Sequence, residues 1–476
     1  MLWEITSAII IIVYAYTILT TIILLLMENR NPVKSIAWIV VLILVPIIGF
    51  VFYLFFGKNI RRQIVLSRRS LYKVKRNSII TSSDIEQISS DILSPEQKNI
   101  ATLARNSCDA LAYEGNKINI YTNGTTLFED IFADLEKAKH HIHLDYYIFL
   151  DDEIGRKVIN LLIRKAKEGV LVRVIIDDVG SWQMPKSTIR EMQSYGIVVM
   201  SFLRVGLPFL SSKVNYRNHR KILIVDGKVG FTGGINIADR YIKGLEWGKW
   251  RDTHVRIEGP AVHGLQKTFL TDWYFVSREL ISNAVFYPEL QKSGNSLVQI
   301  ITSGPNTLFH SVMQVYFMAI VQAREYVYIQ TPYFLPTDSI ITALQTAALG
   351  GVDVRIILPT RSDAKITLTS SYSYMGEMLR AGVKMYFYQP GFLHSKTIVI
   401  DDKMFTVGST NMDFRSFEQN FEINALIFDP ELAVKMKRIF KRDLADSIRV
   451  NARTWKERPV KERLRESIAR LFSPLL

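Results

Sequence analysis

The sequence predicts an α/β protein made of two similar halves that follow a pair of apolar helices. The stretch HRKILIVDGKVGFTGGIN at residues 219–236 returns as HSKTIVIDDKMFTVGSTN at residues 394–411. Each copy comes late in a segment that reads as strand, helix and strand. Two uncharged stretches stand near the beginning of the chain. The fold class is therefore an internal duplication of α/β units behind an N-terminal helical hairpin.

The first 60 residues are expected to form a transmembrane hairpin. Residues 5–27 and 35–57 carry no charged side chain, and each stretch is long enough to cross a hydrocarbon layer about 30 Å thick. Glu4 and the length of the first stretch argue against a secretory signal, and two buried core helices remain the alternative. The positive-inside rule places the catalytic part in the cytoplasm, because basic residues follow the second stretch. They are Lys58, Arg61, Arg62, Arg68, Arg69, Lys73, Lys75 and Arg76.

The rest of the chain divides into a linker, two repeats and a tail. Residues 61–115 are basic and polar and read as a linker, with some helix between residues 81 and about 107. The repeats are expected over 116–290 and 291–445. The repeats share more than their motifs, since Gly169 with Arg173 matches Gly351 with Arg355. Residues 446–476 form a basic tail whose apolar residues recur at helical spacing. They are Val460, Leu464, Ile468, Leu471 and Phe472, and they fit either an interfacial helix on anionic lipid or a docked helix with a solvated basic face.

Composition narrows the classes of partner. The chain has 476 residues, enough for two ordinary domains plus accessory segments. Its 59 Lys and Arg against 45 Asp and Glu give a net charge of +14, which fits a membrane surface or nucleic acid. Cys108 is the one cysteine, so no intrachain disulfide can form and a reduced, cytosolic setting is the simpler interpretation. We expect Cys108 to be a small core residue.

Each repeated stretch predicts a β-hairpin. The β-branched runs 222–225 and 397–400 are typical of strands, and Asp226-Gly227 and Asp401-Asp402 are typical of the turns that follow. Side chains alternate faces along a strand, so the His and the Lys two residues later share one face in each copy. The pairs are His219 with Lys221 and His394 with Lys396.

These residue types suit attack on a phosphodiester. One imidazole can be the nucleophile, the other can protonate the leaving alkoxide, and the lysines can hold the phosphoryl oxygens. Asn236, Ser409 and Asn411 can add hydrogen-bond donors. Neither hairpin has a carboxylate cluster or a Cys/His set with metal-ligand spacing, so we expect chemistry without a metal or cofactor. An ordinary exposed strand face would explain a single copy, but it does not readily explain two copies in register.

The two stretches resemble the paired HKD motifs of the phospholipase D superfamily. The flanking sequence is similar to bacterial cardiolipin synthases over nearly the whole chain, including ENRNP, AWIVVLILVP and FGKN within residues 28–59. The resemblance implies tandem phospholipase D-like α/β/α repeats related by a pseudo-twofold axis. It implies transfer of a phosphatidyl group between two phosphatidylglycerols through a phosphatidyl-histidine, with release of glycerol, at the bacterial cytoplasmic membrane. The catalytic residues it implies are His219, Lys221, Asp226, His394, Lys396 and Asp401.

Two further carboxylates are candidates for orienting the histidines. In the superfamily a carboxylate after the Asn has this role, and Glu422 stands eleven residues past Asn411. Asp252 stands sixteen residues past Asn236, and a plain salt bridge, for instance with Arg251, explains it nearly as well.

Two features depart from a symmetric pair of HKD motifs. The turn positions of Asp226 and Asp401 argue for backbone capping in preference to proton transfer. Gly234 stands where the second copy has Ser409, which makes the two half-sites unequal.

The sequence leaves other points open. The two histidines can exchange roles, and a hydrolase or nuclease would pass the same intermediate to water. The expected membrane spans favour a lipid substrate over nucleic acid. A membrane scaffold with a decayed site is poorly supported by two intact motifs. We interpret His140, His141 and His143 as structural strand residues, and the aromatic residues at strand ends as core or as the wall of a lipid pocket. The latter are Tyr146, Tyr147, Phe149, Tyr328, Tyr333 and Phe334.

Overall fold

The computed structural model describes residues 2–27, 32–45, 49–50, 53, 93–205 and 215–475. The chain forms two compact units. One comprises residues 1–64 with 205–214, and the other comprises residues 65–204 with 215–476. The basic residues 58–76, on which the predicted orientation depends, lie outside the described residues.

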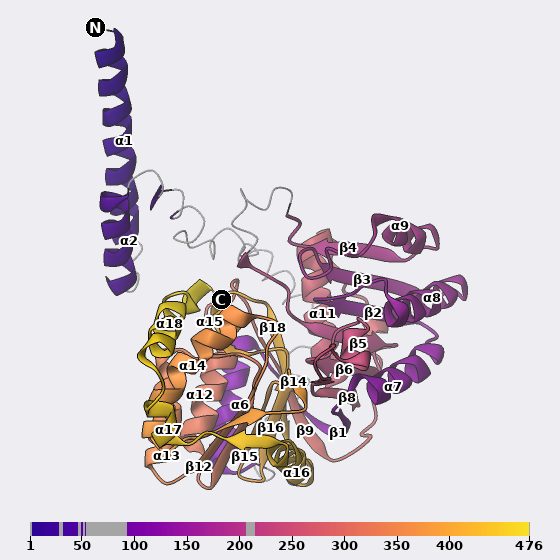
Figure 1. Ribbon diagram of the computed structural model, residues 1–476. Coiled ribbons are helices and arrows are strands. Elements are labelled where there is room, and N and C mark those ends of the chain that lie inside the picture. The colour runs from indigo at the N-terminus through magenta and orange to yellow at the C-terminus, as the bar shows by residue number, and fades with distance from the viewer. Residues whose placement is uncertain are drawn as a thin grey trace. The chain divides into compact units, whose positions relative to one another are not determined.

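The first unit contains two apolar helices that lie side by side, α1 (Leu2–Met27) and α2 (Pro32–Leu44) (Figure 1). In the described part of the chain, no helix combines the length and hydropathy that a membrane crossing requires. The transmembrane spans expected at 5–27 and 35–57 are therefore not found. Helix α2 has 13 residues, and most of residues 46–57 lie outside the described residues.

The second unit carries the duplicated α/β pattern. After α6 (Pro95–Cys108), the first half runs from β1 to α11 and the second half from β9 to α16. The elements of the first half are β1 (Ala112–Tyr121), α7 (Gly124–Glu136), β2 (His141–Tyr146), α8 (Glu153–Lys167), β3 (Leu171–Asp177), α9 (Lys186–Ser194), β4 (Val198–Phe202), β5 (Lys221–Val225), β6 (Val229–Gly233), α10 (Arg240–Lys243), β7 (Lys249–Arg251), β8 (His254–Glu258) and α11 (Val262–Ser277).

The second half follows the short helix η4 (Ala284–Phe286) and has a similar order, apart from a few strands of two or three residues. Its elements are β9 (Ser296–Ser303), α12 (Ser311–Gln322), β10 (Tyr326–Gln330), β11 (Phe334–Leu335), α13 (Asp338–Leu349), β12 (Asp353–Pro359), α14 (Lys365–Arg380), β13 (Lys384–Tyr388), β14 (Gly391–Leu393), β15 (Thr397–Ile400), β16 (Met404–Gly408), β17 (Met412–Asp413), α15 (Phe414–Glu418), β18 (Glu422–Phe428) and α16 (Pro430–Ala445). The chain continues through β19 (Ser447–Arg449), α17 (Ala452–Lys456), α18 (Val460–Leu471) and η5 (Ser473–Leu475).

Strand order shows the duplication directly. One sheet of 15 strands has the order β19-β13-β12-β10-β15-β16-β18-β9-β1-β8-β6-β5-β2-β3-β4. Outward from the antiparallel β1–β9 pair, the two halves give the same order of corresponding strands, and the second half adds one edge strand, β19, next to β13. The hairpins predicted from the two motifs are confirmed as β5–β6 and β15–β16. The two halves therefore share one sheet and lie next to each other along it (Figure 1).

Each half buries its strands between helices. In β2, Ile142, Leu144 and Tyr146 join the core beneath α7 and α8, while His143 on the other face stacks on Phe269 of α11 at 4.3 Å. In the second half β10 is covered in the same way, with Tyr328 stacked on Phe440 of α16 at 4.7 Å. This burial on both faces explains the continuous apolar strands of the sequence.

Part of the expected linker belongs to the folded core. Residues 95–108 form α6, which begins with a capping box between Ser94 and Gln97. Ile100, Ala101 and Ala104 lie on one face of this helix and are buried in the second half's core. The linker over 61–115 thus ends earlier than expected, because apolar residues at helical spacing stand among polar ones.

Candidate active site

Backbone pairing between the halves places His394 beside Asp252. Strand β14 pairs in parallel with β7, with Leu393 opposite Arg251. The residues that follow are His394 and Asp252, and the backbone N–H of His394 donates to the carbonyl of Arg251 at 2.7 Å. The imidazole Nδ1 of His394 then lies 2.7 Å from Asp252 Oδ2. A carboxylate of the first half thus holds the histidine of the second.

The reciprocal contact holds His219. Asn218 and Phe421 form a parallel bridge, and the backbone N–H of His219 donates to the carbonyl of Phe421 at 2.9 Å. The next residue after Phe421 is Glu422, whose carboxylate oxygens lie 3.0 and 3.1 Å from Nδ1 of His219. With Nδ1–H donated to the carboxylate, Nε2 of each imidazole is the nitrogen that can react.

The alternative partner for Asp252 is not used. The guanidinium of Arg251 pairs with Asp443 at 2.7 Å instead. Asp252 is fully buried, and its Oδ1 accepts the backbone N–H of Thr253 at 2.8 Å. Both carboxylates expected from the sequence therefore face imidazoles.

Burial and charge set the protonation of these groups. Burial lowers the pKa of His219 to about 4, against the opposing effect of Glu422. Burial and the Lys396 ammonium likewise lower the pKa of His394 to about 4. Burial alone would raise the pKa of Asp252, but Lys396 and His394 outweigh it and hold that pKa at about 2. At neutral pH the free site thus has neutral imidazoles and charged carboxylates.

The two lysines lie against their own histidines. Lys221 Nζ donates to the backbone carbonyl of His219, and Lys396 Nζ donates to that of His394. Both side chains are buried. Burial lowers the pKa of Lys221 to about 7 and that of Lys396 to about 8, so their charge is lost closer to neutral pH than for an exposed lysine.

The difference between Gly234 and Ser409 has a geometric cause. The Ser409 hydroxyl donates to Oε2 of Glu422 and accepts the backbone N–H of Ile423 at 3.0 Å. At Gly234, an added Cβ would stand 1.9 Å from Oδ1 of Asp252. In the half-site of Glu422, the Ser409 hydroxyl therefore stands beside the carboxylate. In the half-site of Asp252, Gly234 leaves the corresponding space to the carboxylate itself.

The two motif asparagines have different surroundings. Oδ1 of Asn236 accepts the backbone N–H of Ile148 at 3.1 Å, and its Nδ2 donates to the hydroxyl of Tyr241 at 2.5 Å. Oδ1 of Asn411 is buried and has no hydrogen-bond partner within the described residues. Of the two motif asparagines, Asn411 is thus the one whose buried side-chain oxygen lacks a hydrogen-bond partner in the described part of the chain.

Asp226 and Asp401 lie at the opposite ends of β5 and β15 from the histidines. Asp226 accepts three backbone N–H groups, those of residues 139, 140 and 141, at 2.8 to 2.9 Å. Asp401 accepts those of residues 324, 325 and 326 at 2.7 to 2.9 Å. Both have positive φ, near 54°. This geometry supports the capping interpretation of the turns.

Aromatic rings pack around the imidazoles. Tyr147 lies edge-on to His219 with ring centroids 5.0 Å apart, and Trp250 and Phe392 lie 4.9 and 5.3 Å from His394. Tyr333 is 6.4 Å away from His394. Trp250 and Phe392 were not expected at the site, although Trp250 stands two residues before Asp252 in the sequence.

The histidine cluster at the start of β2 is separate from the site. His141 and His143 both bond Gln266 of α11, at 3.3 and 2.8 Å. Burial lowers the pKa of His141 to about 4. These contacts fit the structural interpretation of the cluster.

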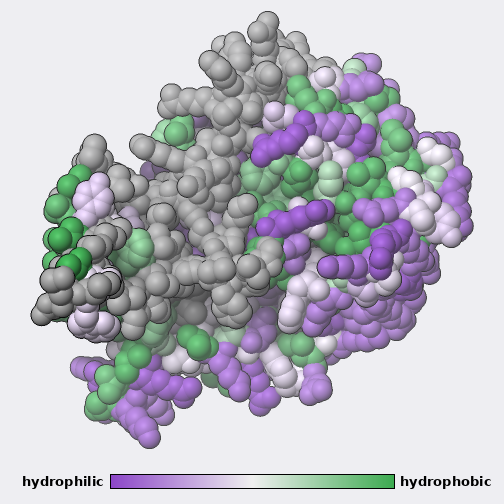
Figure 2. Space-filling view, turned by 90° about the horizontal axis from the view of Figure 1, so that it is seen from above, coloured by the Kyte–Doolittle hydropathy of each residue, from purple (hydrophilic) through white to green (hydrophobic). Residues whose placement is uncertain are grey.

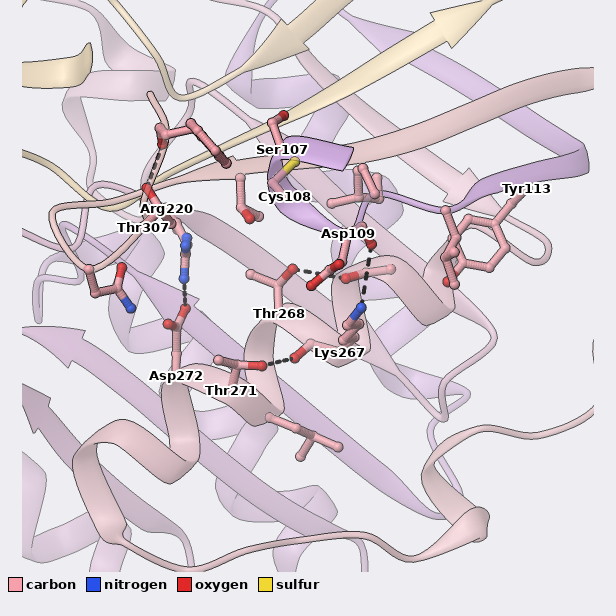
Figure 3. Close-up of a pocket in the computed structure, with 18 of the residues that line it drawn as sticks. Ser107, Cys108, Asp109, Tyr113, Arg220, Lys267, Thr268, Thr271, Asp272 and Thr307 are labelled. Atoms are coloured by element: carbon pink, nitrogen blue, oxygen red, sulfur yellow. Dashed lines mark hydrogen bonds and ion pairs between the residues drawn. The ribbon is translucent and has the colours of Figure 1, made fainter. Parts of the chain in front are cut away.

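Behind the sheet, Arg220 links the site to a cavity of about 330 Å³ (Figure 3). Its guanidinium donates to Asp272 of α11 and, at 3.2 Å, to the backbone carbonyl of Glu422. Cys108 also lines this cavity, and burial raises the pKa of its thiol. Arg220 therefore fixes the start of β18 from the side opposite the imidazoles.

The fold and the crossed imidazole–carboxylate pairs define a phospholipase D-like protein. The crystal structure of phosphatidylserine synthase from Haemophilus influenzae Rd KW20 is similar in fold, with a TM-score of 0.60 at 15% identity over 80% of this chain and 100% of that chain. A family model described as cardiolipin synthase, PLD-like domain, matches residues 131–273 and 316–444. A phospholipase D–nuclease N-terminal model matches residues 9–58.

Curated relatives narrow the family further. The chain is 42% identical to a cardiolipin synthase of Geobacillus sp. (strain WCH70), with 94% of this chain and 90% of the relative covered. It is 39% identical to cardiolipin synthase 2 of Bacillus anthracis, with 94% and 88% covered. The chain belongs to the bacterial cardiolipin synthases of the phospholipase D superfamily.

Proposed function

We propose that the enzyme transfers a phosphatidyl group from one phosphatidylglycerol to another, which yields cardiolipin and glycerol. The observation that carries this proposal is the pair of buried imidazoles, each with Nδ1 on a carboxylate of the other half. Two equivalent bases of this kind suit two displacements at one phosphorus. The names of the relatives support the choice of cardiolipin as the product, and the geometry of the imidazoles supports the two-step transfer.

The first displacement forms a phosphatidyl-histidine. Nε2 of His219 attacks phosphorus, the bond from phosphorus to the glycerol oxygen breaks, and His394 gives that oxygen a proton. The imidazoles of the free site are neutral at pH 7, so His394 must first gain a proton. The negative phosphodiester favours this gain by raising the pKa of the nearby imidazole. Lys221 and Lys396 neutralise the phosphoryl oxygens.

The second displacement releases the product. His394 takes the proton from a hydroxyl of the second phosphatidylglycerol, whose oxygen attacks phosphorus while the bond to His219 breaks. Glu422 and Asp252 stabilise the imidazolium forms, and Ser409 holds Glu422 in place. Any contact of Asn411 with a phosphoryl oxygen is made by its Nδ2 amide group, because Oδ1 of an asparagine can only accept hydrogen bonds.

The test is product analysis with labelled phosphatidylglycerol in mixed micelles that contain a chelator. Cardiolipin and glycerol in equal amounts support the transferase. Phosphatidic acid alone would assign the site to a hydrolase, and turnover only after metal is restored would refute the metal-free route.

The histidine roles need a separate experiment. The His394→Ala variant keeps the nucleophile but lacks the acid of the first step and the base of the second, so it should collect label slowly as an acid-labile phosphoramidate on His219. Label retained by His219→Ala and absent from His394→Ala would exchange the two roles.

Residues 5–57 attach the enzyme to the cytoplasmic membrane in this proposal, as a hairpin that leaves the catalytic unit in the cytoplasm. Support comes from the exposed apolar side chains of α1, among them Trp3, Ile11, Ile12, Tyr16 and Leu19. Membranes washed with alkaline carbonate should retain the protein, and release by high salt alone would replace insertion with peripheral binding.

A further inference from the structure

The last long helix, α18, presents an apolar stripe to solvent. Val460, Leu464, Ile468 and Leu471 are 75%, 59%, 51% and 77% exposed. Their spacing of four, four and three residues places them along one side of the helix. An apolar stripe exposed to solvent in this way indicates a surface that contacts a membrane or another protein.

The helix is docked through its other side. Ala469 is buried, and the buried Glu466 accepts the guanidinium of Arg458 at 3.0 Å. Arg470 pairs with Glu377 of α14 at 3.0 Å and lies over the ring of Tyr374 at 4.0 Å. Small and polar residues thus fix α18 to the core. The helix is docked, as one of the two predictions had it, but the side left to solvent is apolar rather than purely basic.

Basic side chains accompany the stripe. Residues 449–470 contain eight basic residues and three acidic ones, Glu457, Glu462 and Glu466. The basic residues are Arg449, Arg453, Lys456, Arg458, Lys461, Arg463, Arg465 and Arg470. An apolar stripe flanked by positive charge matches an anionic bilayer, which offers acyl chains below negative headgroups. Figure 2 shows hydrophobic and strongly hydrophilic residues side by side on one face of the molecule.

Side-chain contacts connect the end of α18 with elements next to the site. Ser473 Oγ, just beyond the helix, is 2.7 Å from Ser370 Oγ of α14. Asp363, two residues before α14 begins, accepts the hydroxyl of Tyr333 at 2.6 Å, and Tyr333 faces His394. Gln419, after α15, donates to the carbonyl of Pro474 at 3.3 Å. The helix therefore ends on elements that lead directly to the imidazoles.

We infer that the α18 stripe lies on the surface of an anionic bilayer and holds the mouth of the site at the headgroup layer. The benefit to catalysis rests on the proposed function, since it requires a lipid substrate. The contact itself rests on the exposed stripe and its flanking charge. An experiment can therefore reject the benefit to catalysis without rejecting the membrane contact.

Membrane contact is tested by depth-dependent quenching in the full-length protein. Leu464→Cys and Ile468→Cys carry an environment-sensitive fluorophore in a Cys108→Ala background. Leu171→Cys, at the start of β3 in the first half where Leu171 is 48% exposed, is the matched control. Vesicles contain phosphatidylserine, an anionic lipid that lacks the glycerol headgroup, with quencher groups high on the acyl chains. Lipid quenching should affect both stripe labels, spare the control label, and fall about fivefold in pure phosphatidylcholine or at about 1 M salt.

Two results would overturn the inference. One is equal access of an aqueous quencher to the stripe and control labels in phosphatidylserine vesicles. The other is a stripe that is shielded from the aqueous quencher in the absence of lipid and that cross-links through Leu464→Cys to a second copy of the chain. That result would make the stripe a protein interface. The Leu464→Ser, Ile468→Ser variant should turn over lipid about fivefold more slowly in vesicles and normally in detergent micelles. Quenched stripe labels without any cardiolipin formation would reject the proposed function and leave the membrane contact standing.

Discussion

Gly234→Ala should impair catalysis by His394 indirectly, through a displacement of Asp252. The added Cβ would stand 1.9 Å from Oδ1 of Asp252, where real contacts stay beyond 3.0 Å, so the carboxylate must move by about 1 Å. Asp252 cannot simply turn away, because it is fully buried and bonded to Thr253 at 2.8 Å and His394 at 2.7 Å. Such a shift lengthens the bond to His394 beyond about 3.5 Å, where it no longer counts as a hydrogen bond.

The kinetic cost follows from the loss of that bond. An imidazole without its carboxylate loses its fixed tautomer and the stabilisation of its charged form, and with them part of the roughly 10² to 10⁴ that general acid–base catalysis contributes to kcat. We expect kcat for cardiolipin formation to fall about 10²-fold in Gly234→Ala, with KM little changed. The assay is initial-rate analysis of Gly234→Ala, Asp252→Ala and the double variant. Because both changes act through one carboxylate, the double variant should be no slower than Asp252→Ala.

A matched control separates this effect from that of any added methyl group. At Gly376 in α14 the nearest atom to an added Cβ is Nη1 of Arg380, at an ordinary 3.6 Å. Gly376→Ala should keep the normal rate and raise the free energy of unfolding by up to about 1 kcal/mol. A folded Gly234→Ala enzyme with normal kcat would refute the reasoning, as would additive losses in the double variant.

Three further outcomes are expected. Ser409→Ala removes the hydroxyl bond to Glu422 and leaves the backbone N–H of Ile423 without this acceptor. It should lower kcat about tenfold and cost about 1 to 2 kcal/mol of unfolding free energy, and an unchanged kcat in the folded variant would contradict the positioning role. The value of kcat/KM should fall as the pH rises through 7 to 8, because Lys221 and Lys396, with pKa values of about 7 and 8, lose their charge. Lys221→Arg should shift this fall in kcat/KM to higher pH. If kcat/KM of the variant falls at the same pH as before, the fall belongs to another group. Asp226→Asn weakens three backbone hydrogen bonds, so it should cost about 2 kcal/mol of unfolding free energy in a denaturant titration and leave kcat intact, whereas lost activity in a stable protein would restore a catalytic role.

The hairpins could be predicted because their signals are local. A β-branched run followed by Asp226-Gly227 or Asp401-Asp402 specifies strand and turn within a few residues. The assignment of each carboxylate to its histidine could not be predicted, because His394 and Asp252 are 142 residues apart in the chain. Their contact depends on the pairing of two three-residue strands, β7 and β14, which are too short to show a periodicity that would fix their register.

Gly234 could not be interpreted from the sequence for a related reason. In the alignment of the two motifs it is a missing hydroxyl, and only the three-dimensional contact with Asp252 shows that the space is filled. Helix α6 was expected only as some helix within a linker, because its short apolar stripe is surrounded by polar residues. Its burial could not be predicted, since that depends on a core formed two hundred residues later, around Tyr316.

The exchange of carboxylates between the halves makes each histidine depend on the opposite half. An isolated half would contain a histidine and a carboxylate that belong to different pairs, because each serves the opposite half. Two separate halves would have to associate before either imidazole had its carboxylate. One chain that contains both halves removes this dependence on concentration, and it allows the two sides to differ, as Gly234 with Asp252 and Ser409 with Glu422 do.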